Sequence, residues 1–293
     1  MSTLQNKIEF VALISVQMAN ANGDPLNGNR PRIDYDGFGE MSDVCIKRKL
    51  RNRMQDEGKY IFVQSADRRD NKFDNAKSLK ERAETIPALN EAIKKKDADL
   101  FAKIACETWI DVRTFGQVFA FSSGNKEDKE KGVSVGIRGP VSIHQACSVS
   151  PIEIQSIKIT KSVNNEPGEK KGKDTMGDKH FVRFGLYEIK GSINVQLAEK
   201  TGFTEEDAQT IKECLRTLFV NDASSARPDG SMEVYRLYWF QHSCKDGQYS
   251  SAKVHRSIKV NLKDKNAVPS SVDDYVITME ELPGLTPEII EGV

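Results

Sequence analysis

The order of apolar and polar segments along the chain predicts an α+β fold, and three observations carry this prediction. Residues 8–18 form an apolar run rich in strand formers. The segments after Ser42 and Thr204 place apolar residues at helical spacing, directly after a residue suited to cap a helix. Residues 152–160 and 181–197 alternate apolar and polar side chains, as half-buried strands do.

The composition fits a soluble globular chain with no overall charge. Of the 293 residues 38% are hydrophobic and 29% charged, and 43 basic residues balance 43 acidic ones, so nucleic acid would have to bind at local patches. Lys7 and Glu9 interrupt the first apolar run, which argues against a signal peptide, and no run is long enough to span a bilayer. Five scattered cysteines without a CxxC pair indicate the reducing cytoplasm, and no membrane partner is expected.

A long loop at 19–41 leads into the most basic segment of the chain. The loop carries four glycines and two prolines, and loops of this length within a domain are usually functional. Ser42 is a good cap for the helix that follows, and residues 47–53 hold five cations. Because helix N-termini and glycine-rich backbone both receive anions well, this loop and helix predict a phosphate-binding element.

The basic helix is expected to pack by one face and to present cations from the other. At about 100° per residue, one stripe of the helix is apolar. It consists of Ile46, Leu50 and Met54. Lys47, Arg48 and Arg51 fall on the opposite side. Charged helix faces are most often only solvated, so solvation and phosphate binding both remain open for this side.

Three segments have the composition of insertions. Residues 64–106 are charged and mostly helical in pattern, and residues 122–132 form a polar loop of mixed charge. Residues 161–180 are rich in lysine and lie between the two alternating segments. The last of these is therefore predicted to be a long basic hairpin or projecting loop.

The remaining elements complete a recognisable order. Thr204 and Asp207 have the spacing of a capping box, and strands are expected at 234–240 and near 275–279. The predicted order of elements fits an α+β domain of the ferredoxin or RRM type. This order is strand, basic helix, helical insertion, strands, capped helix and strand. No RNP-one run is present, so loops and helix ends, rather than the sheet face, are expected to bind a nucleic-acid backbone.

Two further cations lie beside glycines. Arg113 stands in the segment 111–119, and Arg138 stands in the segment 136–140. An arginine next to a glycine is common and indicates little by itself. Together with the basic helix, however, these positions make three separate cationic elements, which favours an extended anionic ligand.

No pattern for catalysis, a metal or a cofactor is found. Asp24, Asp34 and Asp36 lack the spacing of a calcium loop, and the chain has neither a Walker A motif nor a GxSxG elbow. The histidines lack HExxH or HxH spacing; they are His144, His180, His242 and His255. The motifs therefore predict a protein that is not an enzyme, with no cofactor and no metal.

Several segments resemble the backbone subunit of type I-C CRISPR Cascade complexes, a member of the RAMP superfamily. The resemblance begins with NGDP at 22–25, PRID at 31–34 and SDVCIKRKLRN at 42–52, and it continues in the expected order over most of the chain. The later segments are IDVRTFGQVF at 110–119, IRGPV at 137–141, DTMGDKHFVRFGLY at 174–187 and LAEKTGFTEEDAQ at 197–209.

This resemblance implies a hand-shaped fold. An RRM-like palm would comprise residues 1–54 and 109–293, with helical fingers and web at 55–108 and a thumb hairpin at 161–180. Copies would stack head to tail along the CRISPR RNA as an open filament, without catalysing a reaction. Guide bases would pair with target DNA in antiviral defence, while the protein would bind the RNA backbone and recognise its shape. The other partners implied are a repeat-handle-binding processing subunit, large and small Cascade subunits, and a recruited helicase-nuclease.

The resemblance, together with the cationic elements, also implies a set of RNA-binding residues. Met176 is the candidate wedge that separates stacked bases, since apolar side chains do this in other nucleic-acid complexes. The full set is Asn20, Asn22, Gly23, Ser42, Lys47, Arg48, Arg51, Arg113, Arg138, Met176, Lys179, His180 and Arg227.

Two other functions remain open at this point. Related backbone subunits of type III complexes cut target RNA with an acidic loop residue, so Asp24 or Asp36 would serve in a metal-dependent RNA endonuclease. A stand-alone RNA-binding protein is the other possibility.

Overall fold

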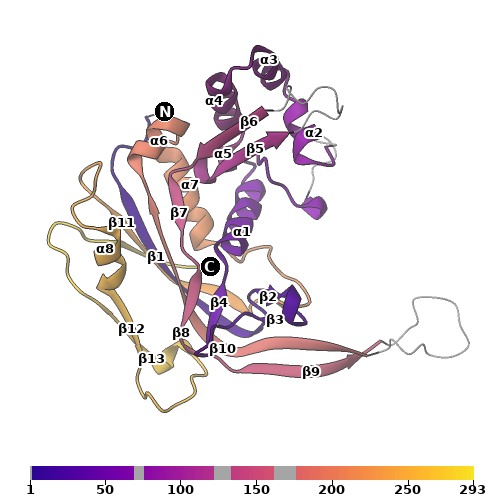
Figure 1. The fold of residues 1–293 in the computed structure, drawn as a ribbon. Coiled ribbons are helices and arrows are strands. Elements are labelled where there is room, and N and C mark those ends of the chain that lie inside the picture. The colour runs from indigo at the N-terminus through magenta and orange to yellow at the C-terminus, as the bar shows by residue number, and fades with distance from the viewer. Residues whose placement is uncertain (1, 69–75, 122–132, 162–175) are drawn as a thin grey trace, which may run out of the picture.

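A computed structural model describes residues 2–68, 76–121, 133–161 and 176–293, and it confirms the α+β class (Figure 1). The α-helices are α1 (Asp43–Asp56), α2 (Leu79–Glu84), α3 (Pro87–Lys95), α4 (Ala98–Thr108), α5 (Ile110–Phe115), α6 (Val195–Thr201), α7 (Glu205–Arg216) and α8 (Ser251–Ser257). Short 3-10 helices are η1 (Pro25–Asn27), η2 (Ala66–Arg68) and η3 (Val272–Asp274).

Strands from both halves of the chain build the main sheet. The strands before the hairpin region are β1 (Ile8–Ala19), β2 (Gly23–Asp24), β3 (Arg30–Pro31), β4 (Phe38–Met41), β5 (Gly116–Phe121), β6 (Val133–Arg138), β7 (Val141–Ile143) and β8 (Ala146–Pro151). The later strands are β9 (Ile154–Thr160), β10 (Met176–Ile193), β11 (Met232–Gln241), β12 (Ile258–Leu262), β13 (Tyr275–Met279) and β14 (Glu288–Glu291). The main sheet has the order β14-β11-β1-β10-β8-β4, and β1 runs antiparallel to both of its neighbours.

Both faces of β1 are buried, which explains its continuous apolar run. Phe10 and Ile14 point to one core, which α1 and α7 cover, whereas Val11 and Leu13 point to a second core beneath the C-terminal segment. That segment carries α8, β12 and β13 and lies on the opposite side of the sheet from α1 and α7 (Figure 1). The predicted strand at 8–18 is thus confirmed as the centre of the fold.

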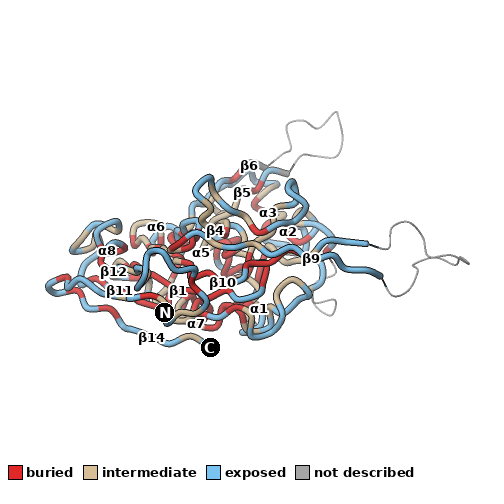
Figure 2. The backbone as a smooth tube through the Cα atoms, turned by 90° about the horizontal axis from the view of Figure 1, so that it is seen from below, coloured by how far each residue is buried: buried red, intermediate tan, exposed pale blue. Residues whose placement is uncertain are grey.

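The hairpin β9–β10 projects from the body of the molecule. The two strands pair antiparallel from Ile154 opposite Val182 to Thr160 opposite Met176. Figure 2 shows that this hairpin is exposed along most of its length. The strand predicted at 152–160 is confirmed, and the middle of the predicted thumb, residues 162–175, lies outside the described residues, as does the predicted loop at 122–132.

A helical lobe with its own core lies beside the sheet. Aromatic side chains pack together there from α4, from β5, from the segment before α2 and from the residue between α4 and α5. The ring centroids of Phe62 and Trp109 lie 4.6 Å apart, and those of Phe101 and Phe119 lie 5.0 Å apart. The helices predicted in 64–106 are found as α2, α3 and α4. The boundaries of the fingers at 55–108 and of the palm stay predictions.

The strand predicted at 181–197 is β10, which begins earlier and ends earlier than predicted. The strand expected to reach 197 ends at Ile193, because the side chain of Asn194 accepts a hydrogen bond from the Leu197 backbone amide at 2.8 Å and caps α6. The capping box of Thr204 and Asp207 is confirmed at the start of α7. The strands predicted at 234–240 and 275–279 are found as β11 and β13, and the tail adds β14 at the edge of the sheet.

Among the helices of the described residues, none has the length and apolar character needed to cross a membrane.

Candidate nucleic-acid interface

The start of α1 is fixed to the loop before it. The Ser42 hydroxyl caps the helix by accepting from the Cys45 amide at 3.3 Å. The side-chain oxygen of Asn22 accepts from both the amide and the hydroxyl of Ser42, at 2.9 and 3.0 Å. Asn22 and Ser42 therefore hold the loop against the helix, and their polar groups are largely used within the chain.

The cations of α1 do not form the free face that the sequence predicted. Arg51 donates from Nε to the carboxylate of Asp111 at 2.9 Å, and its guanidinium lies 4.9 Å from the centre of the Phe115 ring. Asp111 is fully buried and also accepts from the amides of Phe62 and Val63. The expectation of a solvent-facing Arg51 is wrong, since this side chain joins α1 to the helical lobe.

Further cations of the helix are also engaged within the chain. Lys49 is buried and forms an ion pair with Asp222, and burial lowers the pKa of its ammonium group. Arg53 is buried too and donates to the Thr217 hydroxyl at 3.1 Å. Long cationic side chains can leave an apolar stripe and reach an acid beside it, which a helical projection does not reveal.

Lys47 and Arg48 keep part of their exposure. Lys47 pairs with Asp43 at 2.9 Å one turn earlier, and this hydrogen bond lowers the pKa of Asp43. Arg48 donates from one terminal nitrogen to the Val63 carbonyl at 2.7 Å, and partial burial lowers the pKa of its guanidinium. Each side chain retains donors that these bonds do not use.

Two other predicted contacts, Arg113 and Arg227, bind acids of the same chain. Arg113 makes a two-pronged contact with Asp207, at 2.9 and 2.8 Å, which joins α5 to the capping box of α7. Arg227 donates to Asp222 at 3.0 Å, the acid that Lys49 shares. A guanidinium committed to a carboxylate is a poor phosphate donor, so we interpret both arginines as structural, against the sequence prediction.

Asn20 and Gly23 shape a short projection of residues 23–31, here called the tongue, which comprises β2, η1 and β3. The buried Asn20 side chain donates to the Asn29 carbonyl at 2.7 Å. A Cβ at Gly23 would lie 2.1 Å from the side-chain oxygen of Asn29, so any larger residue would require this side chain to move. Gly28 and Asn29 turn the chain with positive φ angles. Asn20 and Gly23 thus position the tongue.

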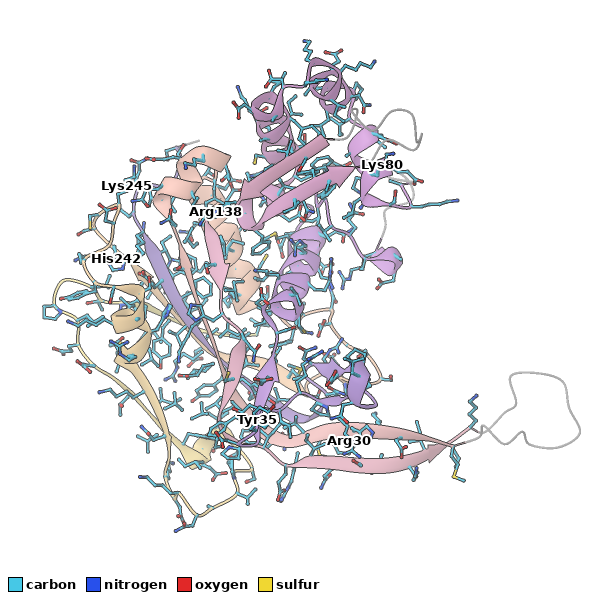
Figure 3. All side chains as sticks on the ribbon, viewed as in Figure 1. Arg30, Tyr35, Lys80, Arg138, His242 and Lys245 are labelled. Atoms are coloured by element: carbon cyan, nitrogen blue, oxygen red, sulfur yellow. The ribbon has the colours of Figure 1, made fainter. Side chains whose placement is uncertain are left out.

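The tongue presents Arg30, which the sequence prediction missed. Arg30 is exposed, and β3 packs against β10 at the base of the hairpin (Figure 3). Its terminal nitrogen donates to the Ser156 hydroxyl of β9 at 3.3 Å, and the same hydroxyl lies 2.8 Å from Nδ1 of His180 on β10. The one sequence feature that could have indicated Arg30 is its position among turn residues. Its contact with β9 could not be predicted from the sequence.

The predicted hairpin residues lie on two different faces. Met176 and His180 share one face with Ser156, Lys158 and Thr160, since paired residues of a ladder point the same way. The opposite face carries Lys179 with Ile157 and Ile159. The Met176 side chain is 69% exposed, whereas His180 is buried.

Arg138 lies far from the hairpin, at the end of β6 (Figure 3). It is exposed and no carboxylate of the described residues pairs with it. Glycine is required beside it, because a Cβ at Gly139 would lie 2.3 to 2.4 Å from backbone atoms of Thr114, Phe115 and Gly116. This close contact holds β6 against the end of α5.

The described residues contain no group of three or more side chains that could hold a metal ion. The carboxylate of Asp24 accepts from the Leu26 amide at 3.1 Å and lies 3.6 Å from Arg32. This acid is therefore used in shaping the tongue.

A sheet covered on one face by helices, a helical lobe and an exposed hairpin arm define an α+β protein with large insertions. Comparison with known sequences identifies its family. The chain belongs to the family described as CRISPR-associated protein Cas7, whose sequence model matches residues 6–280. The resemblance drawn from the sequence is thereby confirmed for the family.

One relative and two solved structures are similar to the chain. A protein named CRISPR-associated protein Cas7 from Haloferax volcanii is 25% identical, over 96% of this chain and 83% of its own length. A chain of a structure titled CRISPR RNA-guided surveillance complex, pre-nicking, is 17% identical with a TM-score of 0.45, over 85% of this chain and 81% of its own. A chain of a CRISPR RNA-guided surveillance complex is 16% identical with a TM-score of 0.43, over 80% and 68%.

Proposed function

We propose that the protein is a non-catalytic, CRISPR RNA-binding backbone subunit of a type I-C Cascade complex. Membership of the Cas7 family is the observation that carries this proposal. Several copies would line one guide RNA in the cytoplasm and leave its bases free to pair with target DNA. The sequence would be read by base pairing, while the protein holds the backbone.

The strand order supports an RRM-like palm. α1 follows β1 after the tongue and β4, and α7 is followed by β11, while the central strands run in the order β11-β1-β10-β8. Two helices on one face of such a sheet are the arrangement expected for the ferredoxin or RRM type. In this proposal the helical lobe forms the fingers and the hairpin β9–β10 forms the base of the thumb.

The predicted cations that keep full or partial exposure support a narrower RNA-binding set than the sequence predicted. Lys47, Arg48, Arg138 and Lys179 would contact guide phosphates, and Asn20, Asn22, Gly23 and Ser42 would shape the loop that approaches them. Cations on separate elements can contact several phosphates along an extended RNA backbone, whereas a compact ligand would need them close together. Met176, exposed on the hairpin, remains the candidate wedge.

Assembly on RNA tests this function. We expect the full chain to bind a guide-length single-stranded RNA in several copies, with a regular footprint that does not depend on the sequence. Native mass spectrometry and nuclease footprinting would measure copy number and spacing. A stable complex of one copy on such an RNA would instead favour a stand-alone RNA-binding protein.

The wedge has its own test. Met176→Ala should leave RNA affinity within about twofold, since an exposed apolar side chain contributes little to phosphate binding. It should change the chemical reactivity of bases at periodic positions. An unaltered probing pattern, with wild-type copy number, would remove Met176 as the wedge.

The endonuclease alternative gains no support from Asp24, whose carboxylate is used by Leu26 and Arg32. Incubation with a complementary RNA and Mg²⁺ or Mn²⁺ tests it directly. Metal-dependent cuts at regular spacing that disappear in Asp24→Ala would overturn the non-catalytic proposal.

A further inference from the structure

The base of the hairpin joins three polar side chains from three strands. Arg30 comes from β3, Ser156 from β9 and His180 from β10. The Arg30 guanidinium donates to the Ser156 hydroxyl at 3.3 Å, and that hydroxyl lies 2.8 Å from Nδ1 of His180. The tongue and the hairpin are therefore connected through one hydroxyl group.

The geometry leaves donors available at this junction. Arg30 uses one of its N–H groups on Ser156, and a guanidinium has five. If Ser156 donates to Nδ1, the neutral His180 ring carries its proton on Nε2; if Nδ1 donates, the Ser156 hydrogen is left over. In either tautomer, one N–H or O–H group of the Ser156–His180 pair is not used in the hydrogen bonds among the three residues.

One acid of the hairpin, Asp178, lies close enough to this junction to interact electrostatically with Arg30. Asp178 lies on the same face of the hairpin and pairs with Lys158 at 2.9 Å. The hydrogen bond from Lys158 is the largest cause that lowers the pKa of Asp178, and the charge of Arg30 makes a smaller contribution, so the direct ion pair of this carboxylate is with Lys158. Arg30 thus forms no ion pair with a carboxylate among the described residues.

The contrast with other arginines indicates what Arg30 does. Arg51, Arg113 and Arg227 each bind a carboxylate of the chain, whereas Arg30 is exposed and oriented by a neutral hydroxyl. The tongue that presents it is fixed by the buried Asn20 side chain. A cation that is positioned, but not bound directly to an acid, is suited to an anionic ligand with several acceptor oxygens.

We propose that Arg30, Ser156 and His180 form a binding site for one phosphodiester group of the guide RNA. Arg30 donates to the phosphate oxygens, and the free donor of the Ser156–His180 pair adds a second contact. Ser156 is also a positioning residue, since it sets the direction of the guanidinium. The site rests on the proposed function and adds residues from the tongue and β9 to it.

Salt-dependent binding tests this site in the full chain. The probe is a fluorescein-labelled single-stranded RNA of guide length, followed by anisotropy at several salt concentrations. Arg30→Ala should weaken binding about tenfold, as expected for a lost charge-assisted hydrogen bond. It should also reduce the slope of log affinity against log salt by about 0.7, the value for one phosphate contact on a single strand.

Two variants separate charge from positioning. Arg30→Lys should restore the salt slope but only part of the affinity. Lysine keeps the positive charge but lacks the planar guanidinium that can donate two hydrogen bonds to one phosphate. Ser156→Ala should weaken binding about threefold with the slope unchanged, because the charge stays and only its orientation is lost. The matched control is Arg183→Ala, an exposed arginine on the opposite face of β10 that pairs with Glu153; it should change neither quantity.

The outcomes distinguish this site from the proposed function. Wild-type binding with an unaltered slope in Arg30→Ala would overturn the site alone, whereas absence of wild-type binding at every salt concentration would overturn both. The Arg30→Ala loss should be the same with a DNA strand of equal length. A loss seen with RNA only would assign Arg30 to a ribose hydroxyl and overturn the phosphate assignment.

Discussion

Helix α1 and the junction of tongue and hairpin use cationic residues in opposite ways. The helix has five cations within seven residues, yet Lys49 and Arg53 are buried and Arg51 is bound to a buried acid. The junction has a single arginine, Arg30, which is exposed and forms no ion pair with an acid in the part of the chain that the structure describes. Charge density along the sequence therefore does not locate the charge that a ligand can reach, because partners distant in sequence take up the cations.

The largest effect is expected at the acid that holds α1 to the helical lobe. Asp111→Ala would leave Arg51 and the amides of Phe62 and Val63 without their buried acceptor. Breaking a buried pair in this way costs about 3–5 kcal/mol of unfolding free energy. Urea denaturation would measure it, with Asp111→Asn as the milder control because it keeps one acceptor oxygen. A loss below about 1 kcal/mol would show that the pair of Arg51 and Asp111 is not structural.

The second test removes the acid shared by Lys49 and Arg227. Asp222→Ala should cost about 3 kcal/mol at pH 7, since it leaves a buried ammonium without a partner. Burial lowers the pKa of Lys49, so the unfolded chain binds more protons than the folded chain as pH rises towards the ordinary lysine value of about 10.4. Stability of the variant should therefore recover with rising pH in that window.

Replacing the lysine provides the control for this second test. Lys49→Met in the Asp222→Ala background removes the buried charge and should abolish the recovery with pH. Denaturation curves at pH 7 and pH 9.5 would compare the two variants. Recovery that persists without Lys49 would have to come from another group.

A third, smaller effect concerns the backbone beside Arg138. Gly139→Ala places a Cβ within 2.4 Å of three backbone atoms that cannot move as a side chain can. Overpacking of this kind costs about 2 kcal/mol. Gly136→Ala, three residues earlier in β6, is the control, since nothing lies within 4 Å of its Cβ position. Equal melting temperatures for the two variants would contradict the close approach of β6 to α5.

The smallest effect on stability, and the sharpest contrast with α1, is expected for Arg138 itself. Arg138→Ala should change the free energy of unfolding by less than about 0.5 kcal/mol, as exposed substitutions do. It should lower the salt slope of RNA binding by about 0.7. Arg51→Ala should show the reverse, a clear loss of stability through Asp111. If both variants lost stability alike, exposure would not distinguish the two kinds of cation.

The sequence predicted the framework of the fold from local signals. The apolar run of β1, the cap at Ser42 and the capping box of Thr204 and Asp207 each depend on residues within a few positions of one another. The resemblance of several short segments then predicted the family. Each of these patterns lies within a short stretch of the sequence, so it can be recognised without knowing the fold.

The candidate site could be predicted only in part, because its partners are distant in sequence. Arg51 meets an acid 60 residues away, Lys49 one 173 residues away, and Arg30 a serine 126 residues away. No periodicity indicates such pairs. The sequence accordingly overestimated the free cations of α1 and missed Arg30.

One property of β10 has a mechanical consequence. The strand runs unbroken for 18 residues, from the middle of the sheet to the far end of the described hairpin. Its first six steps, from Val182 to Met176, extend about 20 Å at 3.3 Å per residue. If this segment moves rigidly with the sheet, a tilt of the sheet by about 5° would displace Met176 by about 2 Å. In the filament proposed above, a small rotation of one copy would therefore produce a larger displacement at the end of this hairpin.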